Sequence, residues 1–267
     1  MARLIIYTIA VLLFGTISLI VQKSAWFAVT SGIALGFLVP LVDALLVNAR
    51  WLRIGYYSIR HWNKRVRISI SYLYRINIDG RYLLVKGSRF DQYQPVGGVY
   101  KTHRSFDAIR QRFNVLTDQL LTPDPVSEND LRVRIRGRNL YGFVQWFDSG
   151  HNREADCLRE FREELLQTAI LPAIPFQNVK YDFITRRYHK LRYSQWAASQ
   201  ELLIADIVEL IPTAEQTTAL RLLNNGTDER YIWADEDQIR RLGAVGGATS
   251  QPIRIAETAL WTIDTHE

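Results

Sequence analysis

The stretch LREFREELLQ, residues 158–167, carries three carboxylates, Glu160, Glu163 and Glu164, within five positions. Positions i, i+3 and i+4 share one face of a helix, so these side chains are expected to converge. Like charges this close destabilise a helix unless a cation neutralises them. Mg²⁺, a hard ion that prefers oxygen ligands, is one such cation. The two arginines of the same stretch, paired with the carboxylates on a solvated face, are the alternative, and the spacing leaves both interpretations open.

Alternation of apolar and polar residues on both sides of this helix predicts a sheet. The Asp79-Gly80 pair favours a type I′ turn, so the strands before and after it are expected to form a hairpin. The expected strands are 65–78, 81–87, 131–137, 140–147 and 201–211. The expected helices are 104–121, 152–169 and a helix that begins after Thr213. No repeat or low-complexity linker interrupts residues 66–267, and we therefore expect one mixed α/β domain, a mixed sheet with flanking helices.

The N-terminal segment, residues 1–50, is apolar in two runs. Residues 4–21 contain no charged residue and residues 25–47 contain only Asp43. At about 1.5 Å per residue, each run is long enough to cross about 30 Å of hydrocarbon as a helix. A cleaved signal peptide is the alternative, but its apolar region is usually shorter. Three residues separate the runs, which predicts a transmembrane hairpin with both ends on one side.

Charge predicts which side that is. The segment 51–65, a basic juxtamembrane linker with interleaved aromatic residues, follows the second run, and no acidic residue lies between Asp43 and Asp79. Lys and Arg accumulate on the cytoplasmic side of membrane helices, so we expect both termini and the α/β domain to be cytoplasmic. Interleaved aromatic and basic residues are typical of a chain that meets anionic lipid, and the bilayer is the expected partner.

The cysteine and histidine content bears on redox state and metal binding. Cys157 is the only cysteine, which excludes an internal disulfide and fits a reducing compartment. The five histidines are scattered without the spacing of a zinc site.

A row of arginines is the second feature with a chemical meaning. Arg132, Arg134 and Arg136 alternate with apolar residues and would project from one face of a strand. Arginine's planar fork suits phosphate, so these three residues, with Lys86 and Arg89, are predicted to bind nucleotide. The alternative is an exposed edge strand that its positive charge protects from aggregation.

The sequence also resembles the Nudix family. Residues 159–164, REFREE, fit the REUxEE core of the Nudix box, in which U is a bulky apolar residue, and PVGG at 95–98 is similar to the proline and glycines that open the box. The resemblance implies a Nudix-like fold and Mg²⁺ on Glu160, Glu163 and Glu164. An acid of the box is replaced by His151, its later glycine by Leu166, and some fifty extra residues separate the two parts. These departures argue against efficient turnover, and we assign no catalytic residue.

A membrane hairpin joined to a divergent Nudix domain resembles the two-transmembrane Nudix effectors of CBASS anti-phage systems. That resemblance implies a cell inner-membrane protein whose cytoplasmic domain senses a cyclic di- or trinucleotide made by a cGAS-like nucleotidyltransferase. It further implies homo-oligomerisation, disruption of the membrane and death of the infected cell. The alternatives are a membrane-anchored, Mg²⁺-dependent hydrolase of nucleoside diphosphate derivatives and a catalytically silent scaffold.

Overall fold

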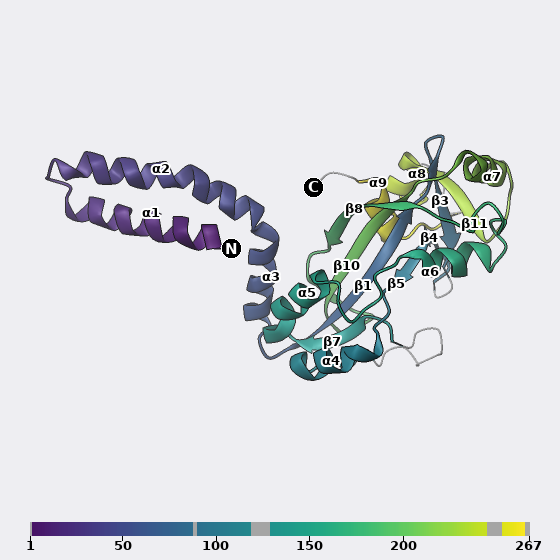
Figure 1. Cartoon of the computed structure of the whole chain (residues 1–267), viewed down its shortest axis with the longest axis horizontal. Coiled ribbons are helices and arrows are strands. Elements are labelled where there is room, and N and C mark those ends of the chain that lie inside the picture. Colours follow the sequence, from purple (N-terminus) through teal and green to yellow (C-terminus); the bar gives the residue numbers. More distant parts are fainter. Residues whose placement is uncertain (1, 88–89, 119–128, 245–252, 265–267) are drawn as a thin grey trace. The chain divides into compact units, whose positions relative to one another are not determined.

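The computed structural model describes residues 2–87, 90–118, 129–244 and 253–264. The chain forms two compact units. The first contains Met1–Lys64 and Gly137–Val144, and the second contains Arg65–Arg136 and Gln145–Glu267. The predicted fold class is confirmed: two long apolar helices precede a mixed, curled sheet with flanking helices (Figure 1).

The first unit begins with a helical hairpin. Its helices are α1 (Ala2–Ile20), α2 (Trp26–Val47) and α3 (Ala49–Arg60). Helices α1 and α2 pack against each other, with the rings of Tyr7 and Phe37 6.1 Å apart. Two helical stretches, Ala2–Ile20 and Trp26–Arg60, are long and apolar enough to cross a membrane. Only 11% of the most apolar part of each is buried inside the protein, so neither resembles the core helix of a soluble domain.

One face of α3 packs within the same unit against residues 137–144, which comprise the 3₁₀ turn η2 (Gly137–Asn139) and the start of α5 (Leu140–Asp148). The hydroxyl of Ser58 donates to the carbonyl oxygen of Gly137 (2.7 Å), and the rings of Trp51 and Tyr141 lie 5.1 Å apart. The segment predicted as a linker is thus largely helical.

The larger sheet of the second unit is built on a central parallel pair, β1 and β10 (Figure 1). Within the described residues it has seven strands, with the path β6-β7-β1-β10-β8, while β5 pairs with β1 and β9 with β10. The strands are β1 (Arg65–Arg75), β5 (Gly97–Val99), β6 (Leu116–Thr117), β7 (Arg132–Arg136), β8 (Tyr181–Tyr188), β9 (Arg192–Ser194) and β10 (Ser199–Leu210). Strand β1 buries Ile68, Ile70 and Tyr72 on one face, and Ser69 and Ser71 alternate with them on the other.

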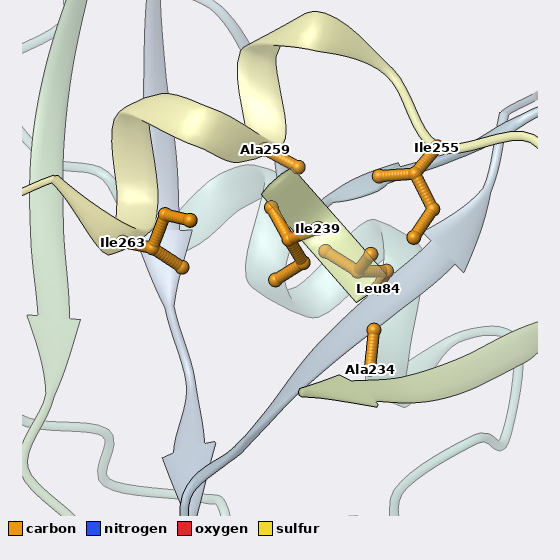
Figure 2. Close-up of a cluster of buried hydrophobic side chains, with 6 residues drawn as sticks. All are labelled: Leu84, Ala234, Ile239, Ile255, Ala259 and Ile263. Carbon is orange, nitrogen blue, oxygen red and sulfur yellow. The ribbon is translucent and has the colours of Figure 1, made fainter. Parts of the chain in front are cut away.

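The smaller sheet carries its own hydrophobic core. Its strands are β2 (Asn77–Ile78), β3 (Arg81–Lys86), β4 (Tyr93–Pro95) and β11 (Tyr231–Asp235). Helix α8 (Glu236–Arg240), the turn η4 (Glu257–Ala259) and helix α9 (Leu260–Ile263) complete this core. Figure 2 shows the buried cluster, Leu84, Ala234, Ile239, Ile255, Ala259 and Ile263. This core ties the C-terminal segment to β3 and β11.

The remaining helical segments are η1 (Arg104–Phe106), α4 (Asp107–Phe113), α6 (Leu158–Phe161), the π-helical turn η3 (Arg162–Leu166) and α7 (Ala214–Asn224). Thr213 caps α7 as predicted, in a capping box with Gln216. The helix predicted over 104–121 is shorter, and its end at 119–121 lies outside the described residues. The helix predicted over 152–169 is also shorter: residues 152–157 are irregular, and the helical part is residues 158–166.

Two other sequence predictions were wrong. Residues 140–147 form helix α5 and not a strand: Leu140, Phe143, Val144 and Phe147 are all fully buried, and their spacing is that of one helix face. The hairpin at Asp79-Gly80 has the expected turn, with positive φ at both residues, but it joins only the two-residue β2 to β3. Strand β1 instead lies inside the larger sheet, where it pairs with β10 along one edge and with β7 and β5 along the other.

Candidate functional site

Two segments of the Nudix-like motif meet in the folded domain. They are the proline-glycine segment, residues 95–98, and the carboxylate helix, residues 158–166, which carries Glu160, Glu163 and Glu164. The backbone N–H of Gly97 on β5 donates to Glu164 Oε2 at 2.9 Å. A side chain at Gly98 would overlap the carboxylate of Glu160, and one at Gly97 would overlap the backbone oxygen of Tyr72. Gly97 is therefore required beside β1, and a side chain at Gly98 would have to displace the side chain of Glu160. The two motif fragments thus form one site despite the residues between them.

Arg159 is the counter-charge of this helix. Its Nη1 contacts Glu160 Oε1 (2.6 Å) and Glu163 Oε2 (3.1 Å), and its Nε contacts Glu154 Oε1 (3.1 Å). Its Nη2 also donates to the carbonyl oxygen of Val99 (2.8 Å). Burial alone would lower the pKa of Arg159, but the hydrogen bond to Glu154 and the charge of Glu160 raise it. Pairing with arginine is thus present for Arg159, but the face is partly buried and not solvated as that interpretation expected.

The carboxylates differ in how readily they ionise. Burial raises the pKa of Glu160, although Arg159 opposes the shift. Burial also raises the pKa of Glu164 to about 8, against the hydrogen bond from Gly97 and with the repulsion of Glu160 and Glu163. At neutral pH Glu164 is therefore largely protonated, which removes one of the repelling charges from the cluster.

These residues, as arranged, do not fit a divalent ion. The part of the chain that the structure describes contains no group of three or more His, Cys, Asp or Glu placed to hold a metal. Arg159 occupies the side of the helix on which Glu160 and Glu163 approach each other, and Glu164 is committed to Gly97. Magnesium binding at Glu160, Glu163 and Glu164 stays a prediction, and it would require Arg159 to release two of them.

Glu154 takes part in this network, and sequence reasoning did not find it. Its carboxylate accepts from the N–H of Lys101 (3.1 Å) and pairs with Arg159. His151, at the position of the missing acid, is exposed. Glu154 lies in an irregular segment without helical or strand periodicity. Its position five residues before Arg159 in the sequence was the signal that could have indicated it.

A cavity of about 600 Å³ lies on the other face of the larger sheet. Side chains alternate across β1, and Ser69, Ser71 and Leu73 line the cavity whereas the hydroxyl of Tyr72, on the opposite face, accepts from the N–H of Glu160 (3.2 Å). The carboxylates are not among the described residues that line the cavity. The sheet therefore separates the cleft from the carboxylate helix.

The walls of this cleft supply charged, amide and aromatic groups. Arg132 of β7 lies beside Ser69 in the register, and Arg192 of β9 and Trp261 of α9 line the cleft as well. Arg132 pairs with Asp130 (3.0 Å) and Arg192 with Glu257 (3.2 Å), the latter also in the lining. The remaining lining residues that bear on binding are Phe90, Gln92, Gln94, Gly97 and Gly98. Ser69 and Ser71 of β1 have small side chains, which leaves space between the larger lining residues.

The other predicted cations are placed differently. Arg134 pairs with Asp118 (2.9 Å) and donates to the carbonyl oxygen of Ala197 (2.8 Å). Asp118 also binds the buried Arg67 at 2.6 Å. Burial would raise the pKa of Asp118, but hydrogen bonds from both arginines lower it. Arg134 is therefore held within the domain by the carboxylate it shares with Arg67.

Arg136, Lys86 and Arg89 complete the predicted set. Arg136 is half-buried at the end of β7, opposite Arg65 in the register. Lys86 lies on β3 in the smaller sheet and forms an exposed ion pair with Asp91 at 3.4 Å. Arg89 lies outside the described residues. Of the five predicted cations, the described lining of the cleft includes Arg132. Arg192, Ser69, Ser71 and Trp261 also line it, and the sequence analysis did not name them. The alternation of Ser69 and Ser71 with apolar residues in β1 was the sequence pattern that could have indicated them.

Comparison with known proteins identifies the domain. Residues 65–263 match the family model of the SMODS-associated NUDIX domain. No curated protein matches the chain. The matched residues begin at the first residue of β1 and end at the last residue of α9, and they include both the carboxylate helix and the cleft. The chain belongs to the SMODS-associated NUDIX domain family, and its two apolar N-terminal helices fit a SMODS-associated NUDIX effector.

Proposed function

We propose that the cleft between Ser69, Arg132, Arg192 and Trp261 binds a cyclic di- or trinucleotide. The observation that carries this proposal is the position of the cleft on the sheet face opposite the carboxylates. A ligand held there meets guanidinium, hydroxyl and amide groups and an indole, and no cluster of acids. This arrangement favours recognition of a phosphodiester over its hydrolysis.

Each wall of the cleft suits one part of such a ligand. Guanidinium groups bind phosphate through paired hydrogen bonds, and Arg132 and Arg192 stand at two sides of the cavity. Side-chain amides such as Gln92 and Gln94 can donate to and accept from a base edge. Trp261 offers a ring on which a base can stack. A volume of about 600 Å³ lies within the usual range of small-molecule sites.

The membrane part supplies the output in this proposal. Helices α1 and α2 cross the cell inner membrane as a hairpin, and the basic residues after α2 keep both termini and the Nudix domain cytoplasmic. One hairpin cannot enclose a water path, because its outer surface must face lipid. Several hairpins can, so ligand-driven homo-oligomerisation of the domain would assemble a membrane-disrupting structure and kill the infected cell, as in CBASS abortive infection.

The ligand must discriminate between assembly states. It can shift a population only by its differential affinity for the two states. Tight binding to a lone protomer would therefore leave the membrane intact. A cGAS-like nucleotidyltransferase encoded beside this protein is the source of ligand that the proposal requires.

The alternative is a membrane-anchored hydrolase of nucleoside diphosphate derivatives. Nudix domains generally use divalent metals, and the retained packing of Gly97 and Gly98 against Glu164 and Glu160 favours this reading. The hydrolase requires its substrate on the carboxylate face, where Arg159 now neutralises Glu160 and Glu163.

One experiment separates the two functions. Full-length protein in dye-loaded liposomes is titrated with a panel of cyclic di- and trinucleotides, with linear dinucleotides as the control, and binding, dye release and nucleotide cleavage are recorded. We expect one cyclic nucleotide to bind and release dye without cleavage, and Arg132→Gln to weaken both binding and dye release. Arg221→Gln, which removes an exposed pair with Asp79 at a turn of the smaller sheet, should leave them unchanged. Mg²⁺-dependent cleavage that Glu163→Gln abolishes would establish the hydrolase instead.

A further inference from the structure

Helix α3 has two unlike faces, and one of them is already occupied. Ile54 and Ser58 are buried, and Ser58 donates to Gly137 within the first unit. On the other side, Leu52, Tyr56 and Ile59 are exposed, the last two by 61% and 72%. Their spacing of four and three residues puts them on one line of the helix. An apolar line this exposed needs a partner that is not water.

Cations flank the exposed line on one side. Arg53 and Arg60 are seven residues apart, so both project along the same edge of α3, next to Tyr56 and Ile59. No acidic residue lies between Asp43 and Asp79. An apolar line edged by arginine is the pattern of a helix that lies in the interface of an anionic bilayer.

The chain itself brings α3 to that interface. Only Asn48 separates the end of α2 at Val47 from the start of α3 at Ala49. If α2 spans the bilayer, then α3 starts within one residue of the headgroup layer. Trp51, by contrast, contacts Tyr141 within the first unit, so the basic and aromatic residues of this segment do not all face lipid.

We propose that α3 is an interfacial helix whose Leu52-Tyr56-Ile59 line is embedded in the anionic headgroup region, with Arg53 and Arg60 on lipid phosphates. The proposal rests on the membrane hairpin of the proposed function. It adds a defined lipid-binding surface to the domain side of that hairpin. Because the opposite face holds residues 137–144, α3 is held between the bilayer and the segment that directly follows β7, the strand that carries Arg132.

Depth measurement by spin labelling tests this surface on the full chain. Single cysteines are introduced at Tyr56, Ile59, Leu46 of α2 and Glu215 of α7 and labelled with a nitroxide, with Cys157 buried and shielded from the reagent. The protein is reconstituted into vesicles of phosphatidylethanolamine and phosphatidylglycerol. Accessibility of each label to oxygen, which enters lipid, is compared with accessibility to a water-soluble nickel complex.

We expect labels at Tyr56 and Ile59 to favour oxygen, as Leu46 does, and the label at Glu215 to favour nickel. In an Arg53→Gln, Arg60→Gln variant, the oxygen preference at Ile59 should fall while that at Leu46 stays the same. Nickel preference at Tyr56 and Ile59 with oxygen preference at Leu46 would overturn the interfacial helix and leave the membrane hairpin intact. Nickel preference at Leu46 would overturn the hairpin and the interfacial helix together. Spin-spin broadening at Ile59 would identify a second copy of the chain as the partner and also overturn the proposal.

Discussion

The N–H of Gly97 donates to the carboxyl of Glu164 across 67 residues of sequence. Strands β6 and β7 and helices α4 and α5 lie between these two residues in the sequence. The contact nevertheless brings the two parts of the Nudix motif, residues 95–98 and 159–164, together. The packing of the Nudix box is thus preserved, although Arg159 neutralises two of its acids and burial largely protonates a third.

Replacing Gly98 with alanine should destabilise the domain. The added methyl group would overlap the carboxylate of Glu160, and overpacking of this kind costs about 1–3 kcal/mol. Thermal unfolding of the full chain in detergent, followed by intrinsic fluorescence, measures the loss. Gly55→Ala is the control for an added methyl group without a close contact, because the nearest atom lies 4.0 Å away. Since Gly55 lies in α3, this variant should be as stable as the wild type or up to about 1 kcal/mol more stable. Equal unfolding temperatures for the two variants would contradict the close contact of Gly98 with Glu160.

Glu164 should make the stability of the domain depend on pH. Its pKa is about 8 in the folded protein, against 4.5 in the unfolded chain. Between these values the folded state binds more protons than the unfolded state, so the free energy of unfolding falls as pH rises from about 4.5 to about 8. Glu164→Gln removes this dependence, and its stability relative to the wild type should therefore be greater at pH 9 than at pH 5.

Chemical denaturation of both proteins between pH 5 and pH 9 measures the difference. Glu215→Gln on α7, an exposed position, is the control for the loss of a glutamate as such. If Glu164→Gln and Glu215→Gln give parallel curves, Glu164 does not hold its proton in the folded state.

Arg67 should be the most sensitive of the sheet arginines. It is 4% exposed and pairs with Asp118 and Glu201, both also buried. Removing one partner of a buried ion pair leaves uncompensated charge and costs about 3–5 kcal/mol, so Arg67→Met should lower the denaturation midpoint strongly. Arg221→Met, at an exposed pair, should have little effect. Similar midpoints for the two variants would show that solvent reaches the Arg67 network.

Arg134 and Arg67 both pair with Asp118. A substitution of Arg134 can therefore reduce nucleotide binding by destabilising the sheet. Arg134→Gln is expected to weaken nucleotide binding only to the extent that it destabilises the sheet. Arg132→Gln, in the cleft lining, removes the pair with Asp130, and it should weaken binding by more than any loss of stability explains. Measuring nucleotide affinity and unfolding temperature for both variants distinguishes a ligand contact from a structural role. If Arg134→Gln lost affinity with an unchanged unfolding temperature, Arg134 would be a ligand contact.

Trp261 tests the stacking surface of the cleft. Stacking of a base on an aromatic side chain contributes about 1–3 kcal/mol, so Trp261→Ala should weaken binding of the cyclic nucleotide by roughly 5- to 150-fold. Trp261→Phe keeps a ring that can pack on Leu73, Ala205 and Ile207 as the indole does, and it should retain most of the affinity. Unchanged affinity in Trp261→Ala would contradict stacking on this ring, and a loss of affinity that a lower unfolding temperature accompanies would indicate that the indole supports the fold.

Local patterns were sufficient for several elements. The apolar runs predicted α1 and α2 to within a few residues, the Asp79-Gly80 pair predicted its turn, and Thr213 predicted the start of α7. The alternation of residues 65–75 predicted a strand there. Each of these depends on spacing within one segment, which the sequence states directly.

The same reasoning failed where two patterns competed. Residues 140–147 are rich in aromatic residues, which favour strands, yet Leu140, Phe143, Val144 and Phe147 have helical spacing and are buried on that spacing. Composition favoured one structure and periodicity the other. Burial of a continuous apolar face decided between them.

By itself, the sequence determined the two long apolar helices, the glycine pair and the acids of residues 160–164, because each is defined by neighbouring residues. Only the tertiary structure decided that β1 pairs with β10, that Arg159 lies among Glu154, Glu160 and Glu163, and that Arg132 lines the cleft while Arg134 binds Asp118. A strand's alternation gives the face on which a side chain lies, but the carboxylate that an arginine meets there comes from another segment. Its distance is set by how the sheet is assembled.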